Sequence, residues 1–269
     1  MPAKSLKLLY KARDLLGLDR GRLPIRYHLG TPNFGDDINL DFFSAVTGRP
    51  TAYAGGNRLH VLGIGSIAQK ANPNSVIVGS GVLESTKIDA TAAFVLSTRG
   101  LITAECLGTR PAFLGDPVSL IDRIFPAEAS PTFELGIIPH ESQLDVLASC
   151  GLDLSRVKII SPKRHHAQVV KDVLGCRRII SQSLHGLIVA DAYAIPNAWL
   201  EPSANMRGGT LKFRDYFSSL DRPKVMHETK DLVARHASFE YTVGRLLCDK
   251  REYLDAIAST TARLFRSGI

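Results

Sequence analysis

Short apolar runs rich in β-branched residues alternate along this chain with longer stretches in which apolar positions recur every three or four residues. The first pattern is typical of buried strands, and the second of helices that pack on a sheet. Strands are expected at residues 23–29, 58–64, 75–79 and 92–97, and again at 133–139, 157–161, 177–181 and 197–200. Helices are expected between them, at residues 36–46, 99–107, 141–149, 165–174 and 184–194. This alternation predicts an α/β fold built on mostly parallel sheets.

The series of strands is interrupted once, at residues 125–133, where two prolines and several small residues indicate a boundary. We therefore expect two Rossmann-like domains that face one cleft, at residues 23–127 and 128–269, preceded by a separate helix at residues 1–22. No strand pattern follows residue 228, and the polar and apolar alternation over residues 230–247 predicts helices that close the second domain.

Composition agrees with a folded protein, since 45% of the 269 residues are hydrophobic. No run approaches the roughly 20 apolar residues of a membrane span, and the N-terminus lacks the apolar core of a signal peptide. A cytoplasmic location is therefore expected. Cys106, Cys150, Cys176 and Cys248 are far apart and lack metal-ligand spacing, which favours buried, reduced thiols.

The positive charge is concentrated at the N-terminus. Residues 1–26 contain seven Lys and Arg against two Asp, a net charge of +5, which leaves +2 of the total +7 for the rest of the chain. No basic face interleaved with aromatic residues is visible, so nucleic acid is not an expected partner. Residues 4–16 read as a basic amphipathic helix with Leu8, Leu9, Leu15 and Leu16 on one side. It either packs on its own domain or contacts an anionic membrane, where each basic residue contributes about 1 kcal/mol.

In open parallel sheets, ligands bind in the loops that follow the carboxyl ends of strands. The first such loop spans residues 28–39, where Gly35 permits a tight turn and Asp36 is placed to cap a helix. It is either a plain strand-to-helix turn, or a loop in which Asn33 contacts a polar ligand and Asp36 acts as a base.

A second loop matches the dinucleotide pattern GxGxxA with Gly63, Gly65 and Ser66. The acidic residue that a dinucleotide fold needs at the end of the next strand is missing, because residues 75–81 end in glycine and serine. A turn that tolerates phosphate, or one that is purely structural, is therefore preferred, and a dinucleotide oxidoreductase is the least favoured class.

Two further side chains follow expected strands. Arg99 is either a surface arginine or a clamp for a carboxylate or phosphate. His185 begins an expected helix and is followed by Gly186, which costs a helix about 1 kcal/mol relative to alanine and suggests a close approach to the backbone. The histidine is either a packing residue or a proton donor at the mouth of a cleft.

Four segments in order, NFGDD (33–37), STRG (97–100), LGDP (114–117) and SLHG (183–186), together resemble the polysaccharide pyruvyl transferase family, and most of all its exopolysaccharide ketal-pyruvyltransferases of the succinoglycan type. The resemblance spans residues 25–217. It implies a two-domain architecture similar to GT-B glycosyltransferases. It also implies transfer of the pyruvyl group of phosphoenolpyruvate onto two hydroxyls of a sugar in an exopolysaccharide repeat unit, with release of phosphate and with no metal or cofactor. The implied acceptor is a lipid-linked oligosaccharide, and the implied location is peripheral at the inner membrane.

The resemblance also implies roles for individual residues. His185 resembles the general acid, and the pKa of an imidazole, about 6.5 in model peptides, suits that role. Arg99 and Lys212 resemble ligands of phosphoenolpyruvate. Many family members carry arginine where this chain has Ser183, so another cation must replace it, and Arg207 is the candidate.

Two other functions remain open at the level of sequence. The first is a nucleotide-sugar glycosyltransferase of GT-B architecture, in which Glu201 would contact the ribose. The second is a non-catalytic protein of polysaccharide assembly.

Overall fold

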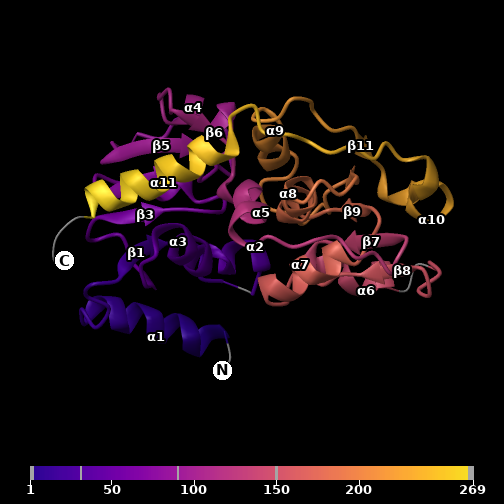
Figure 1. Ribbon diagram of the computed structural model, residues 1–269, viewed down its shortest axis with the longest axis horizontal. Helices are drawn as coiled ribbons and strands as arrows, with labels where there is room; N and C mark the ends of the chain where they lie inside the picture. Colours follow the sequence, from indigo (N-terminus) through magenta and orange to yellow (C-terminus); the bar gives the residue numbers. More distant parts are fainter. Residues whose placement is uncertain (1–2, 31, 90, 149–150, 266–269) are drawn as a thin grey trace.

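The computed structural model describes residues 3–30, 32–89, 91–148 and 151–265, and within them the chain forms two parallel sheets flanked by helices (Figure 1). The first sheet has the order β2-β1-β3-β4-β5-β6, from β1 (Leu23–Arg26), β2 (Thr51–Tyr53), β3 (His60–Leu62), β4 (Ser75–Val78), β5 (Phe94–Thr98) and β6 (Phe113–Leu114). The second has the order β11-β10-β9-β7-β8, from β7 (Leu135–Ile138), β8 (Val157–Ile159), β9 (Ile179–Ser181), β10 (Asn197–Leu200) and β11 (Met226–His227). The predicted α/β class is confirmed, and both sheets are of the Rossmann-like parallel kind.

Helices connect the strands and cover the sheets. Those in the first half are α1 (Ala3–Leu15), α2 (Phe34–Asp37), α3 (Asn39–Thr47), α4 (Leu101–Cys106) and α5 (Ile121–Ile124). Those in the second half are α6 (Leu144–Ala148), α7 (His166–Leu174), α8 (Leu184–Ala192), α9 (Leu211–Phe217), α10 (Leu232–Arg235) and α11 (Lys250–Leu264). The segment 125–133 runs between the two sheets without helix and is mostly exposed.

The strands predicted from continuous apolar runs include those that are buried along their whole length. All four residues of β4, β7 and β10 are buried, as parallel strands covered by helices on both sides require. The three strands that the sequence did not predict, β2, β6 and β11, are two or three residues long and lie at or next to sheet edges. So short a run carries too little periodicity to be recognised.

The C-terminal prediction is wrong over most of residues 230–247. Only α10 and short 3-10 turns form there, and the segment after Phe239 is irregular because the second sheet binds its backbone. Thr242 exchanges backbone hydrogen bonds with Asn197 of β10, and the N–H of Gly244 donates to Asp191 Oδ1 at 2.8 Å. These contacts compete with helix formation.

The closing helix is instead α11, which returns to the first sheet and packs on α3 and β5 (Figure 1). The hydroxyl of Tyr253 in α11 is fully buried; it donates to the carbonyl of Gly115 at 2.9 Å and hydrogen-bonds to Ser97 Oγ at 2.7 Å. Helix α11 thereby completes the core around the first sheet.

Helix α1 docks on its own domain, but not through its leucines. Asp14 accepts the backbone N–H of Gly55 at 2.6 Å and pairs with Arg58 at 3.3 Å, while the side chain of Leu8 stays 69% exposed and that of Leu15 82% exposed. Leu9 and Leu16 are exposed as well. No helix in the described ranges is long and apolar enough to cross a bilayer.

The cysteines for which the structure gives side chains are free thiols, as expected. Cys106 and Cys176 are buried and Cys248 is half-buried. Burial raises the pKa of the Cys176 thiol to about 12, which makes it unreactive. Cys150 lies outside the described residues.

Candidate functional site

A cavity of about 440 Å³ opens between the two sheets and is lined by residues of the loop before α2, the start of α8 and the start of α9. The predicted site residues that line it are Asn33, Asp36, Ser66, Ser183, His185, Arg207 and Lys212. They come from positions as far apart as 33 and 212, so the fold brings together side chains that the sequence links only through motif resemblance.

The turn from β9 into α8 sets the position of His185. Ser181 Oγ accepts the N–H of Ser183 at 3.0 Å and donates to its carbonyl at 2.8 Å, which closes a rigid turn. A side chain at Gly186 would overlap Ser181 and Ile138. The close approach that Gly186 permits is therefore the approach of α8 to its own sheet, not that of a ligand.

The His185 ring lies between the two halves of the protein. A side chain at Gly35 would occupy the space of the imidazole, so glycine is needed there for the ring to reach the cavity. Phe34 meets the ring edge-to-face at a centroid distance of 6.1 Å. The side chain is 12% exposed, which leaves it a small opening to the cavity.

Asp116 is a functional candidate that residue-by-residue reading of the sequence missed. Its Oδ2 lies 3.8 Å from His185 Nε2, and neither atom has a hydrogen-bond partner, although both are buried. Its Oδ1 accepts the N–H of Val118 at 3.0 Å and so fixes the carboxylate. The signal was present in the LGDP motif, because an aspartate before proline caps a helical turn and its second oxygen remains free.

Asp36 lies among basic groups of the cavity. Burial raises the pKa of its carboxyl, and the charges of His185, His28 and Lys212 oppose that rise. Gly65 does not line the cavity, but its φ of +112° and its missing side chain leave room for the Asp36 carboxylate. A carboxylate with a raised pKa in such surroundings is suited to accept a proton.

Lys212 at the start of α9 is the cation that burial perturbs most in this cavity. Burial and the neighbouring Arg99 charge lower the pKa of its ammonium to about 8, against a weaker rise from Asp36. Arg207, five residues earlier, lines the same cavity. The two side chains together offer positive charge to an anionic ligand.

Arg99 lies elsewhere than expected. It is 1% exposed and sits behind the cavity wall, because the absent side chain of Gly81 leaves space for its guanidinium. Its Nε donates to Asp215 Oδ2 at 2.9 Å, Nη1 to Ser66 Oγ at 2.6 Å and Nη2 to the Val82 carbonyl at 2.7 Å. Each of the three guanidinium nitrogens thus donates a hydrogen bond within the protein, and Arg99 does not line the cavity.

The partner of Arg99 connects it to α9. Asp215 is fully buried and also accepts the N–H of Thr103 at 3.0 Å and its hydroxyl at 2.6 Å. Asp215 therefore fastens α9 of the second half to α4 of the first. Lys212 lies three residues before Asp215, so Arg99 positions this lysine through the helix that carries it.

The GxGxxA segment does not form a dinucleotide turn. It leads into a 3-10 turn, Ala68–Lys70, rather than into an α-helix whose N-terminus would hold a pyrophosphate. Gly63 is required by packing, because a side chain there would overlap Asn39 and Phe43. Ser66 and Ile67 are the residues of this segment that line the cavity, and Ser66 is the polar one.

Comparison with known proteins finds two curated relatives. An uncharacterized protein, L143, of Acanthamoeba polyphaga mimivirus is 29% identical over an alignment of 170 residues that covers 59% of this chain and 59% of the relative. The succinoglycan biosynthesis protein ExoV of Rhizobium meliloti is 25% identical over an alignment of 201 residues that covers 70% of this chain and 61% of the relative. The chain thus spans about three fifths of the length of these relatives. No family model and no solved structure matches it.

Proposed function

We propose that this protein transfers the pyruvyl group of phosphoenolpyruvate onto two hydroxyls of a sugar in an exopolysaccharide repeat unit and releases phosphate. The observation that carries the proposal is the opening of His185, backed by Asp116, onto a cavity that also contains Lys212, Arg207 and Asp36. The similarity to a succinoglycan biosynthesis protein supports a role in exopolysaccharide synthesis. The cavity between two parallel sheets agrees with a GT-B-like arrangement.

In the proposed reaction, the imidazolium of His185 protonates the methylene carbon of phosphoenolpyruvate, and C2 becomes electrophilic. One sugar hydroxyl attacks C2 and gives its proton to Asp36. The bond between C2 and the phosphate oxygen then breaks, and the second hydroxyl attacks to close the ketal. The proton held by Asp36 passes to the departing phosphate, and the second hydroxyl gives its proton to His185, so both side chains return to their starting states.

Positive charge near the leaving group lowers the barrier, because negative charge builds on the phosphate as its bond breaks. Lys212 and Arg207 supply this charge at the cavity wall. Arg207 thereby replaces the arginine that many family members carry at the position of Ser183. Arg99 contributes by positioning Lys212 and Ser66.

The direct test is release of phosphate from phosphoenolpyruvate by the purified protein, with and without an acceptor glycan. We expect release that depends on acceptor, and a higher melting temperature with phosphoenolpyruvate than with UDP-sugars. Stabilisation by a UDP-sugar alone would instead favour a glycosyltransferase. Glu201 does not line the cavity and accepts the N–H of Thr229 at 3.4 Å, which gives that alternative little support.

Lys212 predicts a pH dependence of the reaction. Its pKa of about 8 in the free protein means that it loses its charge as the pH rises through 8. If the ammonium binds phosphoenolpyruvate, kcat/KM for this substrate should fall about tenfold per pH unit above that value. Lys212→Arg keeps its charge at high pH, so its profile should stay flat to about pH 10. A falling limb that is identical in Lys212→Arg would show that another group titrates.

Leu8, Leu9, Leu15 and Leu16 form a leucine face along α1 and just beyond its end. This face is suited to contact the membrane that carries a lipid-linked acceptor. The four leucines are exposed, although the helix is anchored by Asp14. Lys11 and Arg20 are exposed nearby, and Lys4 and Lys7 precede them in the sequence. Apolar residues beside basic ones match a bilayer whose surface is anionic. We propose that this face binds such a bilayer.

We expect the protein to sediment with vesicles that contain phosphatidylglycerol, and less with pure phosphatidylcholine vesicles. Replacing Leu8, Leu15 and Leu16 by serine should weaken binding at least tenfold, since each buried leucine contributes about 1.5–3 kcal/mol. The control is Leu154→Ser with Leu247→Ser, two leucines that are exposed outside α1. Equal sedimentation of both variants would refute the membrane role of the face.

A further inference from the structure

Away from the candidate active site, three side chains with metal-binding atoms meet where the two halves of the protein touch. Asp41 lies on α3 of the first half, and His165 and His166 lie at the start of α7 in the second. One carboxylate oxygen and one ring nitrogen from each histidine all lie within 4.8 Å of one another. The proposed reaction uses none of the three.

The buried member of the group is His166. It is 6% exposed, its Nε2 lies 3.2 Å from Asp41 Oδ2, and its Nδ1 has no hydrogen-bond partner. The nitrogen that faces the carboxylate, Nε2, is therefore the ring atom placed to share a metal ion with Asp41.

The other two residues have freedom to adjust. Asp41 and His165 are exposed, and the two histidine rings lie 4.1 Å apart between centroids. Tetrahedral zinc, with bonds of about 2.0–2.1 Å, places its ligand atoms roughly 3.3 Å from each other. The 3.2 Å between His166 Nε2 and Asp41 Oδ2 already meets this requirement. The Nδ1 atom of His165 accepts the N–H of Ala167 at 3.3 Å, so its Nε2 is the ring nitrogen placed to complete the group.

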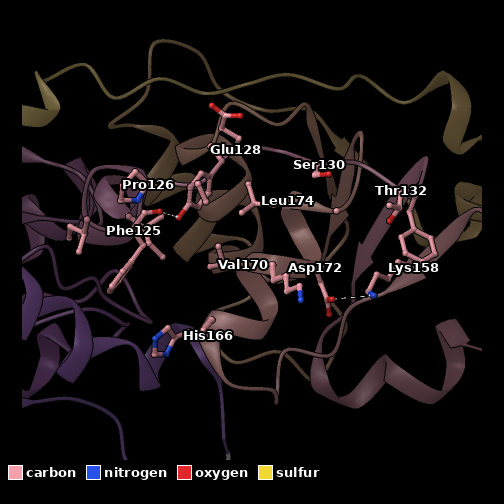
Figure 2. A pocket seen from close by; sticks show the side chains of 18 residues that line it. Phe125, Pro126, Glu128, Ser130, Thr132, Lys158, His166, Val170, Asp172 and Leu174 are labelled. Atoms are coloured by element: carbon pink, nitrogen blue, oxygen red, sulfur yellow. Dashed lines mark hydrogen bonds and ion pairs between the residues drawn. The ribbon is translucent and has the colours of Figure 1, made fainter.

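His166 also lies at the edge of a cavity of about 810 Å³ between α7 and the segment 125–133. Figure 2 shows its ring at the end of that cavity nearest the first half of the chain, apart from the Lys158–Asp172 ion pair. Water can thus reach the group, and a fourth ligand position can be filled by solvent.

We propose that Asp41, His165 and His166 bind a zinc ion, with water as the fourth ligand. Two imidazoles and one carboxylate are a donor set that zinc accepts, whereas magnesium and calcium prefer oxygen ligands. The ion joins α3 to α7 across the two halves. It lies next to α2, which contacts α7 and whose first N–H, that of Phe34, donates to the Pro162 carbonyl at 3.0 Å. Zinc therefore stabilises the loop that carries Asn33 and Asp36, without taking part in the reaction.

The test uses tag-free, chelator-treated protein in equilibrium dialysis against zinc. We expect about one zinc ion per chain, and a dissociation constant raised at least tenfold in Asp41→Asn and in His165→Ala. Both residues are exposed, so these variants should fold normally. His236→Asn, which changes a histidine outside the group, is the matched control and should bind as the wild type does.

A second measurement replaces zinc by Co²⁺, whose visible absorption reports tetrahedral coordination. We expect this spectrum in the wild type and in His236→Asn, and not in Asp41→Asn. Absence of stoichiometric zinc from the wild type, or equal affinity in all four proteins, overturns the proposal. Neither result depends on phosphoenolpyruvate, so failure of the zinc site and failure of the proposed function are separate outcomes.

Discussion

His185→Asn is expected to lower kcat for phosphate release from phosphoenolpyruvate by about 10²- to 10⁴-fold, the range that general acid catalysis contributes. Asparagine is polar and no larger than histidine, so it fits above Gly35 and beside Phe34. It cannot donate a proton near neutral pH. Because the cations that hold the substrate remain, KM for phosphoenolpyruvate should change only a few-fold.

Two comparisons separate this role from a structural one. Asp116→Asn keeps the shape of the side chain but removes the charge 3.8 Å from His185 Nε2, so it should lower kcat less than His185→Asn does. His236→Asn, outside the cavity, should leave kcat unchanged. If His185→Asn retained more than a tenth of the wild-type kcat at an unchanged melting temperature, the proton would have to come from another group.

The sequence was most informative where one short segment determines its own structure. Runs such as SVIV at residues 75–78 form strands buried on both faces, and the apolar composition of the run is by itself enough to indicate that burial. The turn before His185 is equally local, because Ser181 and Ser183 bond to each other within three residues. For this reason the sheets and the turn before His185 could be predicted, whereas the assignment of His185 to the site came from the resemblance.

Features that depend on distant contacts could not be predicted. Residues 242–246 have an apolar pattern compatible with a helix, but Asn197 and Asp191 bind their backbone. The leucines of α1 have the periodicity of a buried face, yet Asp14 turns the helix so that another side docks. The sequence records which residues are apolar, but not which partner is available to cover them.

Arg99 is the clearest example among the site residues. An arginine after a strand is compatible with a ligand clamp and with an internal anchor, and only the position of Asp215, 116 residues later, distinguishes them. The resemblance places Arg99 at the site, and the structure shows how it reaches the site: through Ser66 at the cavity wall and through α9.

Arg99→Met is therefore expected to destabilise the protein by about 3–5 kcal/mol, because it leaves the fully buried Asp215 carboxylate without its cation. Urea denaturation measures this loss. The matched control is Arg177→Met, which breaks an exposed pair with Glu134 and should cost less than about 1 kcal/mol. The double variant Arg99→Met with Asp215→Asn should lose less stability than the two single changes added together, since the unpaired charge is gone.

The same variant, Arg99→Met, also tests whether Arg99 acts on Lys212. The charge of Arg99 lowers the pKa of Lys212, so its removal should raise that pKa above 8 and move the falling limb of the kcat/KM profile to higher pH. An arginine whose charge does not act on Lys212 would leave the limb in place. A stability loss no larger than that of Arg177→Met, or an unmoved limb, would show that Arg99 does not act through α9.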